Sequence, residues 1–337
     1  MNESRIITDE NVLPLLKVED YVNAAKQMLR LQRKDWSQLD LGYENLTSIK
    51  TKSFWFDGFK IEIQFNQGRL KSSSAKVDTE TIQNRKCFLC DENLPIEQRG
   101  IKILPDYILL CNPYPIFPEH FTIVSIIHKP QEILSSFNDF INISKILSGG
   151  YSLIYNGPRC GASAPDHLHF QAGTKEFMPI ENDFHSLKNE FGEFIFEDEI
   201  ETITVIDDGL RRFISLETKD ENTLIKTFNR VYKIYSRLNS GEGEPMMNII
   251  CNYYEDYGWN VIIFLRSKHR SFHYYLEEEK RILISPAAID LGGVSITPAE
   301  KDYEKIDKEL LKNILSEVSL NKESFEHIKI ELKKEFG

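Results

Sequence analysis

The order of strand-forming and helix-forming segments recurs along the chain, and this recurrence limits the folds open to it. In the first half, a predicted amphipathic helix at 131–147 is flanked by apolar segments typical of strands, at 107–111, 121–127, 151–155 and 168–172. After residue 177 a predicted helix at 223–238 is accompanied by further expected strands, at 202–206, 212–216, 247–253, 260–265 and 281–285. We therefore expect an α+β protein with two similar halves, each a mostly antiparallel sheet with packed helices, although no repeat of individual residues is apparent.

The length of the chain also favours more than one core, because 337 residues exceed what a single hydrophobic core usually organises. Residues 1–80 contain a predicted helix at 18–31 and an alternating strand at 59–65, and we expect this segment to join the first half. The first half itself is assigned to residues 81–178. Residues 179–337 form the second half, in which apolar positions after residue 302 predict two closing helices.

Composition excludes several classes of partner. The net charge is -11, whereas proteins that bind a nucleic-acid polymer need lysine and arginine clustered on one face. The N-terminus has no basic region followed by an apolar run, and no stretch approaches the roughly 18 apolar residues of a membrane span. The odd number of cysteines, 5, disfavours a disulfide framework. We expect a cytoplasmic protein with no membrane or nucleic-acid partner.

The segment 156–171 concentrates polar side chains in a short stretch. His167, His169 and Gln171 alternate in a predicted strand, so all three project from one face. A loop with small residues precedes them, at Gly157, Gly161 and Ser163. Small residues let backbone N–H groups approach an anion, and a neutral imidazole beside a phosphate can attack phosphorus and later leave. Two structural histidines after an ordinary turn are the alternative that a bare His-x-His would favour.

The order Asn, Gly, Gly-x-Ser and His-x-His-x-Gln resembles the signature of the histidine-triad (HIT-like) superfamily. The resemblance is to its transferase branch, which includes galactose-1-phosphate uridylyltransferase, diadenosine tetraphosphate phosphorylase and GDP-L-galactose phosphorylase. It implies two HIT-like halves and a covalent nucleotidyl-histidine formed when His169 attacks the α-phosphorus. Gln171 would hydrogen-bond the phosphoryl oxygens, and it stands where a hydrolase of the superfamily usually has a third histidine. Ser163 and Gly161 match the phosphate cradle, and Asn156 matches the family asparagine.

Further binding residues are expected around this signature. Gly157 directly follows the asparagine, with a shorter spacing to Gly161 than in the uridylyltransferase, and Arg159 could neutralise phosphate charge. Asn66 and Arg69 follow the strand at 59–65 and could hold a phosphate or a sugar. A later cationic group offers the same chemistry, at Arg266, Lys268 and Arg270. For each of these cations and polar groups a solvated surface position is the alternative.

A second motif concerns a metal. Cys87 and Cys90 have the spacing of half a zinc site, and the pair alone is equally compatible with structural thiols. The stretch from Pro118 through His120 to His128 resembles the histidine-triad segment in which Pro-x-His opens a strand. In zinc-containing relatives the metal takes two cysteines, the second histidine of this stretch and the first of His-x-His. The resemblance thus implies a closed, structural zinc on Cys87, Cys90, His128 and His167, with His120 as the rival third ligand.

The end of the chain narrows the expected reaction. Residues 281–294 and the closing helices resemble the C-terminus of GDP-hexose phosphorylases. The resemblance implies a nucleotidyltransferase of the phosphorylase type that acts on a nucleoside diphosphate sugar, with a small nucleotide or nucleotide sugar and phosphate as partners. A diadenosine polyphosphate phosphorylase or hydrolase is one alternative, and a non-catalytic nucleotide-binding module is another. The sequence is compatible with a homodimer, and it specifies neither the base, the sugar nor the acceptor.

Overall fold

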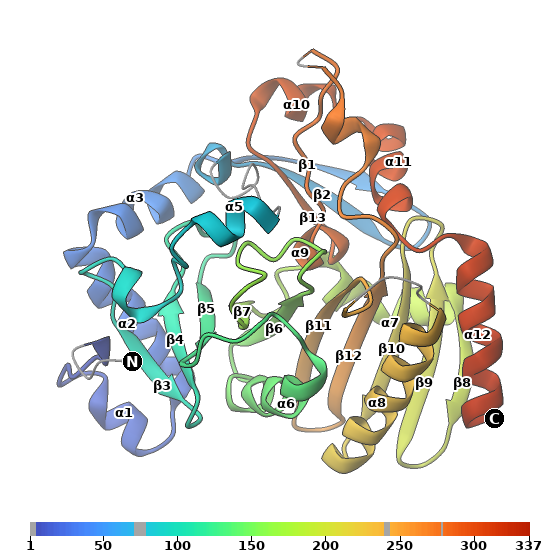
Figure 1. The fold of residues 1–337 in the computed structure, drawn as a ribbon, viewed down its shortest axis with the longest axis horizontal. Coiled ribbons are helices and arrows are strands. Elements are labelled where there is room, and N and C mark those ends of the chain that lie inside the picture. Colours follow the sequence, from blue (N-terminus) through green and yellow to red (C-terminus); the bar gives the residue numbers. More distant parts are fainter. Residues whose placement is uncertain (1–4, 71–78, 239–242, 278) are drawn as a thin grey trace.

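A computed structural model describes residues 5–70, 79–238, 243–277 and 279–337. One ten-stranded sheet runs through the molecule (Figure 1). From one edge to the middle its strands are β3 (Gly100–Ile103), β4 (Tyr107–Cys111), β5 (His120–Ser125), β7 (His169–Thr174) and β6 (Tyr151–Asn156). From the middle to the other edge they are β11 (Met247–Tyr254), β12 (Gly258–Leu265), β10 (Arg212–Thr218), β9 (Glu201–Asp207) and β8 (Gly192–Glu197). All neighbouring strands in this sheet are antiparallel.

The two sides of this sheet have the same topology. Each contains three strands, a helix and two further strands, and the last strand inserts between the third and the fourth. The helices are α6 (Phe137–Ile146) on the first side and α8 (Glu221–Leu238) on the second. The two sides join where β6 pairs with β11, so that Asn156 lies opposite Asn248. The predicted α+β fold with two similar halves is confirmed, and the halves share one continuous sheet.

Both faces of the central strands are covered, which explains their continuous apolar runs. All residues of β12 are buried. Trp259, Val261 and Ile263 point into the core that contains α6 and α8, whereas Ile262 and Phe264 point into the core of the opposite face. The burial of both faces holds each strand in register, because a shift by one residue would exchange the two sets of side chains.

The remaining helices cover the sheet and its edges (Figure 1). The predicted helix at 18–31 is α2, which begins after Asp20, whose side chain accepts a hydrogen bond from the backbone of Asn23. The two predicted closing helices are α11 (Lys308–Val318) and α12 (Lys322–Phe336). The other described α-helices are α1 (Leu13–Lys17), α2 (Tyr21–Asp35), α3 (Ser37–Leu46), α5 (Thr79–Asn84), α7 (Pro179–Phe191), α9 (Ala288–Leu291) and α10 (Glu300–Lys305).

A second, three-stranded sheet lies beside the first, formed by β1 (Lys50–Trp55), β2 (Lys60–Phe65) and β13 (Val294–Thr297). β1 was not predicted because it is a polar edge strand, and β13 because its partner β2 lies far away in the sequence. The strand expected at 281–285 is wrong. Ile282 and Ile284 are buried there, but the segment has no strand pairing in the structure.

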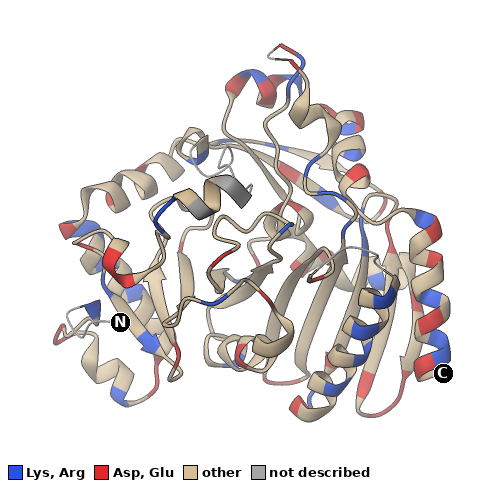
Figure 2. Ribbon diagram, in the orientation of Figure 1, with Lys and Arg blue, Asp and Glu red and all other residues tan. Residues whose placement is uncertain are grey.

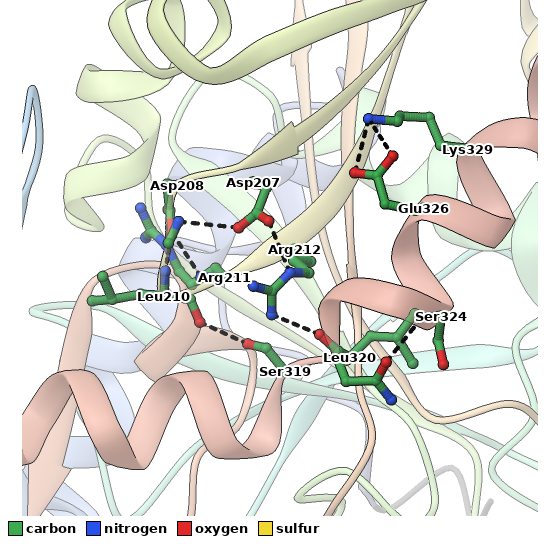
Figure 3. Close-up of polar contacts among 12 residues, drawn as sticks. Asp207, Asp208, Leu210, Arg211, Arg212, Ser319, Leu320, Ser324, Glu326 and Lys329 are labelled. Carbon is green, nitrogen blue, oxygen red and sulfur yellow. Dashed lines mark hydrogen bonds and ion pairs between the residues drawn. The ribbon is translucent and has the colours of Figure 1, made fainter.

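Polar contacts fix the second half to the closing helices (Figure 3). The turn between β9 and β10 contains a buried ion pair between Asp208 and Arg211, with 2.6 Å between Oδ2 and Nε. Arg212 donates to the carbonyl of Leu320, and the Ser319 hydroxyl donates to the carbonyl of Leu210. These bonds hold the junction of α11 and α12 against the end of the sheet.

The charged side chains are mixed in sign on the closing helices. Lysine and arginine are interspersed with aspartate and glutamate along α11 and α12 (Figure 2), whereas the charged residues of α8 are mainly lysine and arginine. This distribution differs from the single-sign surface that binding to a nucleic-acid backbone requires. Within the described residues, no helix combines the length and the apolar character needed to cross a membrane.

Candidate active site

The candidate active site is a cleft of about 460 Å³ to which both halves contribute. Residues of β6, β7 and their connection form one wall, with Asn156, Gly161, Ser163, His169 and Gln171. The second half forms another polar wall, with His269, Arg270, Ser285, Ala287 and Asp290. A third wall is largely apolar, with Phe88, Leu89, Leu94, Pro95, Leu110 and Ile116. A ligand with a phosphate and an apolar ring system matches this division of the walls.

His169 presents an unprotonated nitrogen to the cleft. Its backbone N–H donates to Oε1 of Gln131 at 2.8 Å, and its Nδ1 lies 2.8 Å from the carbonyl oxygen of His167. A carbonyl only accepts, so Nδ1 carries the proton and Nε2 keeps its lone pair. Burial lowers the pKa of His169 to about 4, against a small opposing effect of the bond to His167. The imidazole is therefore neutral at physiological pH, and the lone pair of Nε2 is available for attack on an electrophile.

Gln131 fixes the position of His169 as well. Its side-chain Nε2 donates to the carbonyl oxygens of His169 and Asn156, both at 2.9 Å. Together with the bond that it accepts, this buried amide connects the nucleophilic strand to the end of β6. Two hydrogen bonds to the backbone of His169 and one to that of Asn156 restrict the movement of the imidazole.

Gln171 is oriented by His120. The backbone N–H of Ile116 donates to Nδ1 of His120 at 3.2 Å, so the proton of the neutral ring is on Nε2. That Nε2 lies 2.9 Å from Oε1 of Gln171 and donates to it. The amide oxygen is thus occupied, and the amide N–H₂ is the group that Gln171 offers to the cleft. Burial, with a contribution from Arg69, lowers the pKa of His120 to about 3, so this arrangement persists across the physiological range.

The loop between β6 and β7 carries the predicted phosphate cradle. Gly161 and Ser163 both line the cleft. Gly161 has φ +97°, and a Cβ there would lie 2.7 Å from Cβ of Ala287, so only glycine fits. The carbonyl of Ser163 accepts a hydrogen bond at 3.1 Å from Arg85, which also pairs with Asp166 at 3.0 Å. The loop is held from outside, and its small side chains face the cleft.

Two residues of this loop do not occupy the predicted positions. Gly157 is buried, its N–H donates to the carbonyl of Met247 at 3.1 Å, and a Cβ would approach that oxygen to 2.8 Å. Its small size serves strand pairing, and its N–H is not free for a phosphate. Arg159 is exposed and donates to the carbonyl of Glu244 at 2.9 Å. Neither residue lines the cleft, so the geometry gives no support to their assignment to phosphate binding, which stays a prediction.

The two predicted ligand groups of the N-terminal segment, Asn66 and Arg69, differ in their position relative to the cleft. Asn66 is buried, donates to the carbonyl of Pro115 at 3.3 Å and does not line the cleft, so its assignment as a ligand group stays a prediction. Arg69 lines the cleft, with Nη1 2.7 Å from the carbonyl of Tyr114. Burial lowers the pKa of Arg69 to about 10, so it remains a cation at neutral pH.

The three predicted cations of the second half, Arg266, Lys268 and Arg270, also differ in their position relative to the cleft. Lys268 forms an exposed ion pair with Glu317 at 2.8 Å, and Arg266 is buried among protein acceptors. Arg270 alone of the three lines the cleft, where its Nε donates to the hydroxyl of Ser285 at 2.8 Å. The second half therefore supplies a cation to the cleft through Arg270.

The four predicted metal ligands lie together, with their ligand atoms all within 4.8 Å of one another. Sγ of Cys87 lies 3.3 Å from Nδ1 of His167, and Sγ of Cys90 lies 3.1 Å from Nδ1 of His128. Tetrahedral zinc with bonds of about 2.1 and 2.3 Å would separate sulfur and nitrogen ligands by about 3.6 Å. Two thiols and two imidazoles in this arrangement can bind a metal, and the donor set fits zinc.

The surroundings of this cluster fit a metal site too. Nε2 of His167 lies 2.8 Å from the carbonyl of Ser125 and donates to it, which leaves Nδ1 as the donor atom toward a metal. His120 bonds to Ile116 and Gln171 instead and is not part of the cluster. The rival ligand set with His120 is thereby excluded.

The roles that three residues have around the site were not predicted: His120 was considered only as a rival metal ligand, and Gln131 and Asn248 were given no role. His120 lay in a recognised motif, but its contact with Gln171 depends on the pairing of β5 with β7. Gln131 and Asn248 belong to no short motif. Asn248 donates to Oδ1 of Asn156 at 2.7 Å, although 92 residues separate them. Only a pairing signal between distant strands would have identified it.

Comparison with known proteins supports the assignment of the fold. No curated protein sequence matches the chain at a significant level. Residues 28–174 match the family described as "Domain of unknown function (DUF4922)". Residues 188–337 match the family described as "GDPGP1-like, C-terminal domain".

Among solved structures, yeast Ap4A phosphorylase Apa2 in complex with AMP is similar, with a TM-score of 0.57 and 18% identity over 87% of this chain and 96% of that chain. A second structure of the yeast enzyme gives a TM-score of 0.58 and 17% identity over 87% and 97% of the two chains. Its complex with Ap4A gives 0.52 and 15% over 84% and 96%. This chain has the fold of yeast Ap4A phosphorylase. The resemblance stated from the signature residues is thereby confirmed at the level of fold.

The second half has no copy of the histidine signature. β12 corresponds to β7 in the topology, and its residues are Gly-Trp-Asn-Val-Ile-Ile-Phe-Leu. This strand holds no imidazole that could act as a nucleophile. Among the residues that the structure describes there is one candidate site of this kind, with His169 on its first-half wall.

Proposed function

We propose that the protein is a nucleotidyl-transferring phosphorylase that acts on a nucleoside diphosphate sugar through a covalent nucleotidyl-His169 intermediate. The observation that carries the proposal is the orientation of His169, whose unprotonated Nε2 belongs to a neutral ring at the cleft. Gln171 offers an amide N–H₂ beside it. A nucleophile and a hydrogen-bond donor on one wall are what transfer at phosphorus requires.

The reaction proceeds in two displacements. The lone pair of Nε2 of His169 attacks the α-phosphorus, an N–P bond forms, and the bond from that phosphorus to the bridging oxygen breaks. The sugar 1-phosphate leaves as an anion. An oxygen of inorganic phosphate then attacks the same phosphorus, and the N–P bond breaks. The nucleoside diphosphate is released, and the imidazole of His169 returns to its neutral form. Gln171, Ser163 and the backbone at Gly161 stabilise the charge on the phosphoryl oxygens in both steps.

The match of residues 188–337 to the GDPGP1-like C-terminal family supports the nucleotide sugar as substrate. The presence of a glutamine at position 171 supports phosphorolysis over hydrolysis, since histidine-triad hydrolases usually carry histidine there. A diadenosine polyphosphate phosphorylase is the second candidate, and the fold shared with yeast Ap4A phosphorylase favours it.

We also propose that Cys87, Cys90, His128 and His167 hold a structural zinc ion. When bound, the ion would supply fixed coordination and no chemistry at phosphorus, because its four protein ligands close the site. His167 connects this site to His169, because it lies in a bend two residues before His169, where β7 begins, and not within the strand as predicted. The metal cluster therefore supports the nucleophile by positioning.

The test is covalent labelling with nucleotide sugars that carry a radioactive α-phosphate, in the absence of inorganic phosphate. We expect labelled wild-type protein, no label in His169→Ala, and full labelling of the control His185→Ala, which changes an exposed histidine on α7. Addition of phosphate should release the label as nucleoside diphosphate. Label that appears from Ap4A and from no nucleotide sugar would select the second candidate. Nucleotide binding without labelling from any donor would indicate a non-catalytic module.

A further inference from the structure

We propose that Arg266 and Asn248 of the second half form a positioning relay that turns the amide N–H₂ of Asn156 toward the phosphoryl group in the cleft. The proposal rests on the proposed function, because it assigns a task to the second half in that reaction. Arg266 and Asn248 are positioning residues and do not touch the substrate. Asn156 is the group they orient, at the end of β6.

The orientation of Asn156 follows from a backbone donor. The N–H of Ala288 points at the side chain of Asn156 at 2.9 Å, and a donor requires an oxygen there. That atom is therefore Oδ1, and the side chain of Asn248 approaches it at 2.7 Å with its Nδ2. Both lone pairs of Oδ1 are then occupied. The remaining polar group of Asn156 is its amide N–H₂, and Asn156 lines the cleft.

Asn248 has no freedom to reverse its own amide. Its Nδ2 also donates to the carbonyl of Cys160 at 2.7 Å, and its Oδ1 accepts a hydrogen bond from Nη1 of Arg266. A reversed Asn248 would place N–H₂ against a guanidinium and an oxygen against two acceptors. The bond to Cys160 additionally holds the residue before Gly161, so the same side chain fixes the phosphate loop.

Arg266 is itself committed to the protein and unable to bind a ligand. It is buried, with its Nε 3.2 Å from the carbonyl of Val318 and its Nη1 3.0 Å from that of Pro286. Its Nη2 donates to the carbonyls of Lys268 and His269 at 2.9 and 3.0 Å. With the bond to Asn248, its five N–H groups all have acceptors. Arg266 thereby fixes Asn248 and the segments that carry the cleft residues 269–270 and 287.

The relay has a chemical purpose in a nucleotidyl transfer. Charge on the non-bridging oxygens of the phosphoryl group changes as the bond to His169 forms, and a donor held in place costs no reorganisation at that moment. A freely rotating Asn156 would present its oxygen to an anion for part of the time. The second half thus contributes to catalysis through an amide that belongs to the first half.

The test compares matched deletions on one strand. Asn248→Ala removes the amide that donates to Asn156 and to the carbonyl of Cys160. The control Asn252→Ala removes a buried asparagine four residues later on the same face of β11, outside the cleft. In single-turnover labelling we expect the rate of nucleotidyl-histidine formation to fall about a hundredfold in Asn248→Ala, as for loss of one oriented donor. Asn252→Ala should keep the wild-type rate, and nucleotide affinity should change little in either variant.

If Asn248→Ala destabilises the protein too far for a rate measurement, Asn248→Asp is the second variant, because it keeps the size of the side chain. The carboxylate retains Arg266 as an ion-pair partner, but it cannot donate to Asn156, whose amide would then turn away from the cleft. We expect a folded protein with a lower melting temperature than wild type, because a carboxylate oxygen then faces the carbonyl of Cys160, and a loss of labelling rate at least as large as in Asn248→Ala. In addition, combining Asn248→Ala with Asn156→Ala should cost little more labelling rate than Asn156→Ala alone, because the relay acts through Asn156.

The outcomes separate the two proposals. Wild-type protein that forms no nucleotidyl-histidine would overturn the proposed function. Wild-type protein that labels normally, together with unchanged rates in folded Asn248→Ala and Asn248→Asp, would overturn the relay alone. Additive losses in the double variant would also contradict it.

Discussion

The two halves of the sheet share a topology and differ in what corresponding strands carry. In the first half, β7 brings His169 and Gln171 to the cleft, and His120 on β5 hydrogen-bonds to Gln171 from behind it. In the second half, β12 is entirely buried and largely apolar. Buried polar groups are costly unless they are satisfied. The comparison teaches that one half is stabilised mainly by burial, whereas the other requires specific partners for the polar side chains of its site.

Loss of the metal cluster should have the largest effect on stability and should be confined to the first half. In Cys87→Ser we expect loss of bound zinc and a decrease of the unfolding free energy by several kcal/mol, because the ion joins segments distant in sequence. Metal analysis and hydrogen exchange measure this, with protection lost in β5 and β7 before β10 and β12. Cys251→Ser is the control and should keep its zinc. Equal loss of protection in both halves would break the comparison.

The side chain of Glu244, in the second half, contacts the first half and should make the unfolding free energy depend on pH. This buried carboxyl accepts from the backbone of Ile133 and from the hydroxyl of Tyr155, both at 2.6 Å. Burial raises the pKa of Glu244 to about 7. Between its ordinary pKa and pH 7 the folded state keeps a proton that the unfolded state loses, so the unfolding free energy falls as pH rises, by at most about 3 kcal/mol.

Glu244→Gln should remove this decline. Urea unfolding at pH 5 and pH 8 should show the variant gaining stability relative to wild type at the higher pH. Parallel pH profiles for the two proteins would contradict a raised pKa at this position. This measurement tests a contact between the two halves, and the substitution should not change the metal cluster.

A smaller effect on rate is expected from His120, which orients the glutamine. His120→Phe removes the donor to Oε1 of Gln171, so the amide can reverse and the labelling rate should fall about tenfold, or about 1.4 kcal/mol. Since the pKa of His120 is about 3, the ratio of wild-type to variant rates should be constant between pH 6 and pH 8. His185→Phe is the control. A rate equal to wild type would show that Gln171 needs no such partner.

The smallest effect is expected from Arg159. It is exposed, bonds to a backbone carbonyl and does not line the cleft. Arg159→Ala should change the labelling rate less than twofold and stability by less than about 0.5 kcal/mol. A large loss of nucleotide affinity would restore the role that the sequence first suggested for it.

The sequence predicted most of the strands in both halves, because apolar periodicity is a local property. It missed β1, a polar edge strand, and β13, which pairs in parallel with a strand distant in the sequence. It also missed β3 and β8, the two edge strands of the large sheet. For the site, the histidine segment and the cysteine pair were recognisable as motifs. Gly157, Arg159 and Asn66 were assigned to the ligand because their residue types suit phosphate, but their bonds are to protein carbonyls.

The sequence by itself determined the nucleophile candidate, the metal-binding residues and the repeated order of strands and helices. Only the tertiary structure decided which nitrogen of His169 faces the cleft and how the amides of Gln171 and Asn156 are turned. Those orientations depend on His120, Asn248 and Ala288, which reach the site from other strands and loops. A local motif specifies which groups are present, whereas the direction of a donor is set by partners that only the folded chain brings within hydrogen-bond distance.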